Sequence, residues 1–219
     1  MRKITKLNIA ITAAVFVVFL VAGYFLLPSI LGDTVYSIPA QYLPMIRESS
    51  QKEGVDPALV AGILMQESHF NPDAVSYAEA KGMSQFMDGT ARTMAKRYNM
   101  TTYNIFDAET AILFCAGHLK DLLVRYGGDT DAALAAYNAG GGNVDVWYRL
   151  GMPQNYPSQG YVRKIKNYRD IFAALYPNEL GLTNSKFDTT VEVKTEKKPV
   201  FSAFWNSIFQ RFSLPESDK

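Results

Sequence analysis

Residues 56–68 read DPALVAGILMQES, and this stretch gives the clearest indication of a helical fold. Asp56 is a favourable cap for the start of an α-helix, and Pro57 suits the first helical position. Apolar residues dominate the rest of the stretch. The Asn-Pro pair that follows shortly afterwards is incompatible with a longer helix, so the helix must end near Ser68. Glu67 therefore lies at the carboxyl end of an apolar helix.

The residues on either side of this helix also show helical periodicity. Apolar residues recur at the i, i+3 and i+4 spacing of helices, and we find no convincing run of strands. The pattern predicts further helices over 44–53, 90–98, 108–126, 130–138 and 161–175, with Thr90 as a helix cap and irregular loops at 70–85, 99–106 and 139–160. Residues 36–177 are enough for one hydrophobic core. The sequence therefore predicts a single all-α domain.

The two ends of the chain differ from this middle part. Residues 7–27 are apolar and follow three basic residues, which predicts a cytoplasmic stub and transmembrane anchor over 1–32 and an extracytoplasmic domain, on the periplasmic or cell-wall side. A cleaved secretory signal is the alternative, although its apolar part should be shorter. Residues 178–199 predict a polar linker, and 200–214 predict an amphipathic aromatic helix. That helix could lie in a membrane interface or dock on the domain or on a cell-envelope protein.

The composition excludes several classes of function. The 219 residues include 22 Lys and Arg against 21 Asp and Glu, so the chain lacks the basic excess of nucleic-acid-binding proteins. Its one cysteine, Cys115, cannot form an intrachain disulfide, and two histidines add too few ligands for a ready structural zinc site. We therefore expect no metal, no cofactor and no nucleic-acid partner.

Three segments could carry chemistry. At the end of its apolar helix, Glu67 should have a raised pKa, so that it could donate a proton near neutral pH. Gln85, within GMSQF at 82–86, offers a donor and an acceptor to a ligand. Tyr137 and Asn138 end an alanine-rich helix, and a flat ring beside an amide suits the faces and rims of a sugar. Taken singly, each segment also fits an ordinary structural explanation: an exposed helix end, a turn and a helix cap.

The order of four segments is more specific than any one of them. ESHFNPDAVS at 67–76, GMSQFM at 82–87, ALAAYNAG at 133–140 and YVRKI at 161–165 together resemble the soluble-lytic-transglycosylase type of lytic transglycosylase domain. This is glycoside hydrolase family 23, which is related to goose-type lysozyme, and the resemblance covers about residues 42–176. It implies a lysozyme-like helical fold with a groove for peptidoglycan glycan strands. It also implies cleavage between N-acetylmuramic acid and N-acetylglucosamine without water, leaving 1,6-anhydro ends.

The resemblance also implies roles for individual residues. Glu67 would be the single catalytic residue, first an acid and then a base. The residues implied to bind substrate or support Glu67 are Ser68, Gln85, Tyr137, Asn138 and Tyr161. Among them, Gln85 would line the groove beside the scissile bond, and the Tyr161 hydroxyl would orient the catalytic carboxyl.

The sequence departs from the family pattern near these residues. Met83 and Ser84 stand where Leu and Met are usual, Ala111 where Asn is frequent, and Cys115 where Gly is frequent. Ser84 would either add a hydrogen bond to sugar or leave a less apolar groove wall. We expect Cys115 to be a buried, unreactive side chain.

Two other functions stay open at this stage. A hydrolase (muramidase) on the same fold would need a second acid to activate water, and Asp73, Glu79 and Asp88 are the nearby candidates. A non-catalytic peptidoglycan-binding or assembly protein would need no intact acid. The products of cleavage would separate these functions.

Overall fold

The computed structural model describes residues 15–19, 22, 36–153 and 155–184, and residues 38–184 lie within one compact unit. Its helices are α2 (Tyr42–Glu53), α3 (Pro57–Ser68), α4 (Asp88–Arg97), α5 (Ala108–Arg125), α6 (Thr130–Ala139), α7 (Gly141–Arg149) and α8 (Gln159–Leu175), followed by the 3-10 helix η1 (Leu182–Asn184). Within the described ranges there is no strand, only isolated bridges from Val75 to Lys81 and from Lys81 to Phe86. The all-α prediction is confirmed.

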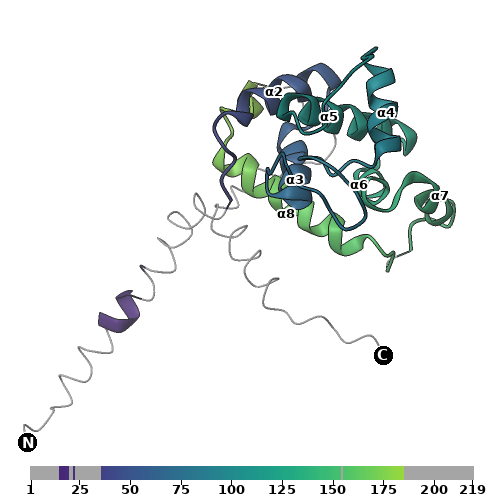
Figure 1. Ribbon diagram of the computed structural model, residues 1–219. Coiled ribbons are helices and arrows are strands. Elements are labelled where there is room, and N and C mark those ends of the chain that lie inside the picture. The colour runs from purple at the N-terminus through teal and green to yellow at the C-terminus, as the bar shows by residue number, and fades with distance from the viewer. Residues whose placement is uncertain (1–14, 20–21, 23–35, 154, 185–219) are drawn as a thin grey trace, which may run out of the picture. The chain divides into compact units, whose positions relative to one another are not determined.

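Helix α3 lies in the middle of this unit, beside α8 (Figure 1). Every residue from Pro57 to Met65 is buried, as expected of a helix that is apolar on all sides. A Cβ atom at Gly62 would lie 2.9 Å from the carbonyl oxygen of Ile165, so the close approach of α3 and α8 requires glycine there. The predicted cap is also confirmed, since the Asp56 carboxylate accepts two backbone N–H bonds at 2.8 and 3.4 Å. Its second oxygen pairs with Arg169 of α8 at 2.7 Å.

The other predicted helices are confirmed to within two residues at each end. The predicted cap at Thr90 is wrong, because α4 begins at Asp88 and the residue before it is Met87, which makes no side-chain capping bond. An acidic residue in the first turn suits the positive end of the helix dipole.

The loop predicted over 139–160 is wrong in its first half, where α7 forms. Gly140, at a φ of +81°, ends α6 and at once precedes α7, so the run of glycines joins two helices. Tertiary contacts then hold the short helix. Val144 is fully buried, and Asp145 pairs with Arg125 and accepts a bond from the Tyr126 hydroxyl at 3.0 Å.

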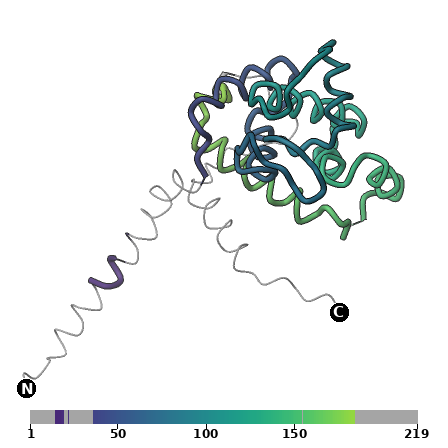
Figure 2. Tube along the Cα trace, in the orientation of Figure 1, coloured from purple at the N-terminus to yellow at the C-terminus, as the bar shows by residue number. Residues whose placement is uncertain are grey.

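The compact unit continues beyond the predicted boundary at residue 177. Leu180 is 1% exposed, and the carbonyl oxygen of Glu179 accepts a bond from the Arg47 guanidinium at 3.4 Å. Figure 2 shows this last part of the unit returning to α2. Residues 178–184 therefore belong to the domain, and the linker prediction is corrected there.

Several predictions for the chain ends lie outside the described residues. They concern residues 185–199 of the linker, the aromatic helix at 200–214 and most of the anchor at 7–27, of which residues 15–19 are helical. In the described part of the chain, no helix is both long enough and apolar enough to cross a membrane.

Candidate active site

The Glu67 carboxyl lies half-buried at the carboxyl end of α3. One of its oxygens accepts a hydrogen bond from the Tyr161 hydroxyl on α8. Burial raises the pKa of this carboxyl from 4.5 to about 7, while the bond from Tyr161 acts in the opposite direction because it stabilises the charged form. Near neutral pH the group can therefore both donate and accept a proton.

The backbone turns sharply just after Glu67. His69 and Phe70 have φ values of +54° and +61°, a left-handed backbone conformation that residues other than glycine seldom adopt. The Phe70 ring is buried and packs edge-on against Phe172 at 6.0 Å between centroids, which offsets the cost of this conformation. The turn fixes where α3 ends and hence where the carboxyl lies. His69 itself is exposed.

Ser68 connects the end of α3 to residues 82–86, which we call the GMSQF turn. Its hydroxyl donates to the carbonyl oxygen of Met83 at 2.8 Å. The turn is closed at its base, where Lys81 and Phe86 exchange two backbone hydrogen bonds of 3.0 Å. The Ser68 proton is thus used to hold this turn beside Glu67.

Gln85 is bonded mainly to its own loop. Its amide nitrogen donates to the carbonyl oxygens of Gly82 at 2.9 Å and Ala74 at 3.2 Å. Both amide hydrogens are used in this way, so the carbonyl oxygen of the side chain is the group left to accept a bond from a ligand. Gly82 is required for the turn, since its φ is +72° and a Cβ would lie 2.2 Å from the carbonyl oxygen of Ile105.

Tyr137, at the end of α6, also bonds to the GMSQF turn. Its hydroxyl donates to the carbonyl oxygen of Ser84 at 3.1 Å and lies 3.6 Å from the Cys115 sulfur. Its ring packs against Phe86 and His118, with centroids 5.7 and 5.2 Å away. Burial raises the pKa of the Tyr137 hydroxyl, and the nearby Cys115 and Glu67 side chains raise it further. Tyr137 is thus neutral near pH 7, and its proton is available for the bond to the GMSQF turn.

Asn138 joins the end of α6 to the start of α8. Its side-chain amide nitrogen donates to the Ser158 hydroxyl at 3.1 Å. Ser158 is 2% exposed and directly precedes α8, three residues before Tyr161. The bond therefore holds the exposed Asn138 near the helix turn that carries Tyr161.

The structure thus brings the six predicted site residues to one region, where α3 ends, the GMSQF turn lies, α6 ends and α8 begins. It corrects both expectations for Ser84, which is fully buried and donates to the carbonyl oxygen of Ala111 at 2.6 Å. Sequence reasoning also missed Ser158 as the partner of Asn138. Ser158 stands in a polar segment, Asn-Tyr-Pro-Ser-Gln, so no signal in the sequence marks it as buried or names its partner.

The remaining titratable groups nearby are neutral or exposed. Cys115 is fully buried, and burial raises the pKa of its thiol to about 12, so it is unreactive as expected. Burial lowers the pKa of His118 to about 4. Asp73, Glu79 and Asp88 are exposed, and Asp88 pairs with Lys81 at 3.0 Å. Among the described residues, no group of three or more His, Cys, Asp or Glu side chains could hold a metal ion.

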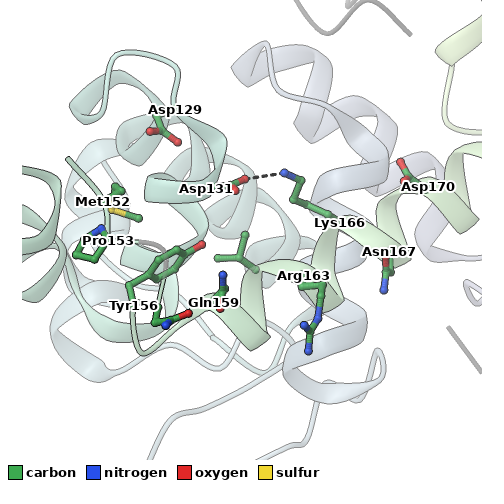
Figure 3. Close-up of a pocket in the computed structure, with 12 residues that line it drawn as sticks. Asp129, Asp131, Met152, Pro153, Tyr156, Gln159, Arg163, Lys166, Asn167 and Asp170 are labelled. Carbon is green, nitrogen blue, oxygen red and sulfur yellow. Dashed lines mark hydrogen bonds and ion pairs between the residues drawn. The ribbon is translucent and has the colours of Figure 1, made fainter. Parts of the chain in front are cut away.

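A pocket of about 830 Å³ lies elsewhere, between the start of α6, the residues Met152, Pro153, Asn155 and Tyr156, and one face of α8 (Figure 3). Asp131 and Lys166 pair across it at 2.8 Å. On α8, Tyr161 lies roughly 200° around the helix from the pocket residue Gln159, and so on another face. None of the predicted site residues lines this pocket. We therefore place the candidate active site at Glu67, where the shifted pKa and the converging hydrogen bonds occur.

Comparison with known proteins gives a family match over this region. The family model for the transglycosylase SLT domain matches residues 44–156, just over half of the chain. Membrane-bound lytic murein transglycosylase C from Haemophilus influenzae (strain PittGG) is 34% identical over 142 residues, which are 55% of this chain and 39% of that protein. The protein of the same name from Actinobacillus succinogenes is 34% identical over 121 residues, 48% of this chain and 32% of its own. This chain thus spans under two fifths of the length of these relatives.

Solved structures share the fold. The 70 kDa soluble lytic transglycosylase of Escherichia coli has a TM-score of 0.58 and 23% identity, covering 67% of this chain and 26% of that one. An inactive mutant of the lytic transglycosylase Slt from Pseudomonas aeruginosa has a TM-score of 0.55 and 23% identity, covering 64% and 25%.

Proposed function

Because this chain belongs to the transglycosylase SLT domain family, we propose that it is a peptidoglycan lytic transglycosylase. It would cleave the β-1,4 bond between N-acetylmuramic acid and N-acetylglucosamine without water. The observation that carries this proposal is the half-buried Glu67 carboxyl, which accepts a hydrogen bond from Tyr161 and has a pKa raised to about 7. The names of the relatives, lytic murein transglycosylases, support the substrate class.

The proposed reaction uses Glu67 twice. In the first step the protonated carboxyl gives its proton to the glycosidic oxygen, the bond from C1 to that oxygen breaks, and the N-acetylglucosamine side leaves as an alcohol. In the second step the carboxylate takes the proton of the muramoyl C6 hydroxyl, whose oxygen bonds to C1 and closes the 1,6-anhydro ring. Glu67 is protonated again at the end, so no second carboxylate and no water are needed. A pKa near 7 makes both forms accessible.

The other site residues divide into two groups in this proposal. Tyr161 orients the Glu67 carboxyl directly. Gln85 and Asn138 each use their amide nitrogen within the protein, so each offers a side-chain carbonyl oxygen to hydroxyl or acetamido N–H groups of the glycan. Ser68 and Tyr137 act through the GMSQF turn, since their hydroxyls donate to its carbonyl oxygens.

Digestion of purified sacculi followed by mass spectrometry of the released fragments tests the proposal. We expect 1,6-anhydro-muramoyl ends; reducing muramic acid ends would instead identify a muramidase. The Glu67→Gln variant should still bind sacculi but lose about 10²-fold to 10⁴-fold in cleavage rate, since a positioned acid typically contributes that much. Glu79→Gln, at an exposed acid of the loop that follows α3, is the matched control and should cleave normally. Binding of sacculi by the wild-type chain without any cleavage would identify a binding or assembly protein.

We further propose that residues 7–27 anchor the chain in the cytoplasmic membrane with the domain on the extracytoplasmic side. The apolar run behind Arg2, Lys3 and Lys6 supports this topology, and the relatives are named membrane-bound. The full chain should stay in the membrane fraction after extraction with high salt and alkaline carbonate. A chain without residues 1–32 should be released, and protease added outside the membrane should digest only an exported domain.

A further inference from the structure

We propose that Ser84, Cys115 and Tyr137 form one buried unit that positions the GMSQF turn beside Glu67, so that Ser84 and Cys115 are positioning residues for the reaction. Only the kinetic part of this inference rests on the proposed function. The unit begins with three contacts. The Ser84 hydroxyl donates to the carbonyl oxygen of Ala111 at 2.6 Å, and the Ser84 carbonyl oxygen accepts from the Tyr137 hydroxyl at 3.1 Å. The Tyr137 hydroxyl also lies 3.6 Å from the Cys115 sulfur.

These contacts converge on one strip of α5. Ala111 and Cys115 are four residues apart, so they lie on the same face of the helix, one turn above the other. Ser84 approaches the first of them from the turn, and Tyr137 approaches the second from α6. Ser84, Ala111 and Cys115 are all fully buried. A hydrogen-bonded group of this kind responds as a unit, because moving one buried member leaves its partners unpaired in a medium without water.

The unit is directly connected to the candidate active site. Ser84 lies between Met83, whose carbonyl oxygen is held by Ser68 at 2.8 Å, and Gln85, which offers its side-chain oxygen to the glycan. Three successive residues of the turn are thus fixed by bonds to α3, to α5 and α6, and to the loop itself. A shift of Ser84 would therefore displace both the contact beside Glu67 and the Gln85 side chain.

The first test compares two fully buried serines in the purified full chain. Ser50, on α2, is the matched control, since no hydrogen-bond partner of its hydroxyl occurs among the described residues. We expect Ser84→Ala to lower kcat about tenfold with KM changed less than about twofold, because small misplacements near reacting groups are costly in rate. A displaced turn should also admit water near Glu67, which lowers the pKa of this carboxyl. The loss of activity at high pH should then begin at a lower pH than in the wild type. Ser50→Ala should leave kcat and the pH profile unchanged.

The second test asks whether the three residues act as one unit. Cys115→Ser keeps an acceptor for Tyr137 and should retain most of the activity, whereas Cys115→Ala should lose about as much as Ser84→Ala. The double variant Ser84→Ala/Tyr137→Phe should lose little more than the worse single variant, because contacting residues are not additive. Fully additive losses, or a Ser84→Ala variant with an unchanged kcat and pH profile, would overturn the proposal.

Hydrogen exchange separates this proposal from the proposed function. Ser84→Ala should speed exchange of the Gln85 and Phe86 amide protons about tenfold or more relative to the wild type, and Ser50→Ala should not, since exchange reports local opening. Faster exchange in a chain that does not cleave sacculi would support the unit and contradict the activity. Unchanged exchange would overturn the unit even if cleavage is observed.

Discussion

Glu67 titrates within the range of neutral pH, because burial raises its pKa to about 7. The first proposed step needs the protonated carboxyl, so we expect kcat/KM to fall as pH rises through about 7. The measurement is the pH profile of fragment release from sacculi between pH 5 and 9. A rate that keeps rising to pH 9 would show that the ionised carboxyl alone is sufficient, as for a general base.

Tyr161 provides a directional test of the same group. Its hydrogen bond stabilises the carboxylate and so lowers the Glu67 pKa against the larger effect of burial. Tyr161→Phe should therefore move the fall of kcat/KM to higher pH. It should also reduce the maximal rate by roughly tenfold, since the carboxyl loses its orienting partner. Tyr77→Phe, at a fully exposed tyrosine, is the control and should change neither value. A shift to lower pH in Tyr161→Phe would contradict the assigned direction.

The same pKa predicts an effect on folding stability. Between about pH 4.5 and 7 the unfolded chain releases the Glu67 proton while the folded chain keeps it, so this residue lowers the free energy of unfolding as pH rises. Glu67→Gln has no such proton. The stability of the variant relative to wild type should increase by roughly 2–3 kcal/mol from pH 4 to pH 8. Urea unfolding of both proteins at pH 4 and pH 8 measures this change. If the difference in unfolding free energy between variant and wild type is the same at both pH values, burial does not raise the pKa of Glu67.

Replacing glycine by alanine should have opposite effects on the stability of the domain in the GMSQF turn and in the helix that follows it. Gly82→Ala should destabilise the domain by about 2 kcal/mol or more, because φ is positive and the new Cβ would meet the Ile105 carbonyl oxygen. Gly89→Ala lies in the first turn of α4 with open space around it, and should stabilise by about 0.5–1 kcal/mol. Thermal unfolding of the two variants would settle the comparison. Equal effects would show that the turn tolerates a side chain.

Local signals in the sequence were sufficient for some elements and not for others. Asp56 and Pro57 define the start of α3 by their own chemistry, so that boundary could be predicted. α7 depends on Asp145 reaching Arg125, a contact between elements that periodicity does not reveal. The candidate site divides in the same way. The resemblance to the lytic transglycosylase family suggested the candidate residues, but Ser84 bonds to a backbone carbonyl on another helix, and nothing in the sequence identifies such a partner.

The residues that follow α8 complete the packing of the domain. Leu180 is 1% exposed, and Glu179 bonds through its carbonyl oxygen to Arg47 of α2, so the last described residues cover the helix with which the domain begins. This packing predicts that a chain of residues 36–184 is more stable than one of residues 36–177. The difference should be about 2–3 kcal/mol, the value of burying one leucine side chain.

Two variants of the longer chain separate burial from length. Leu180→Ala in residues 36–184 should lose about 2–4 kcal/mol, because it removes buried methyl groups and leaves a cavity. Thr183→Ala, at an exposed side chain three residues later, should lose little. Urea unfolding of the four chains gives the comparison. If residues 36–177 and 36–184 unfold at the same urea concentration, Leu180 contributes nothing to the core, and the domain ends at residue 177 as its sequence alone had predicted.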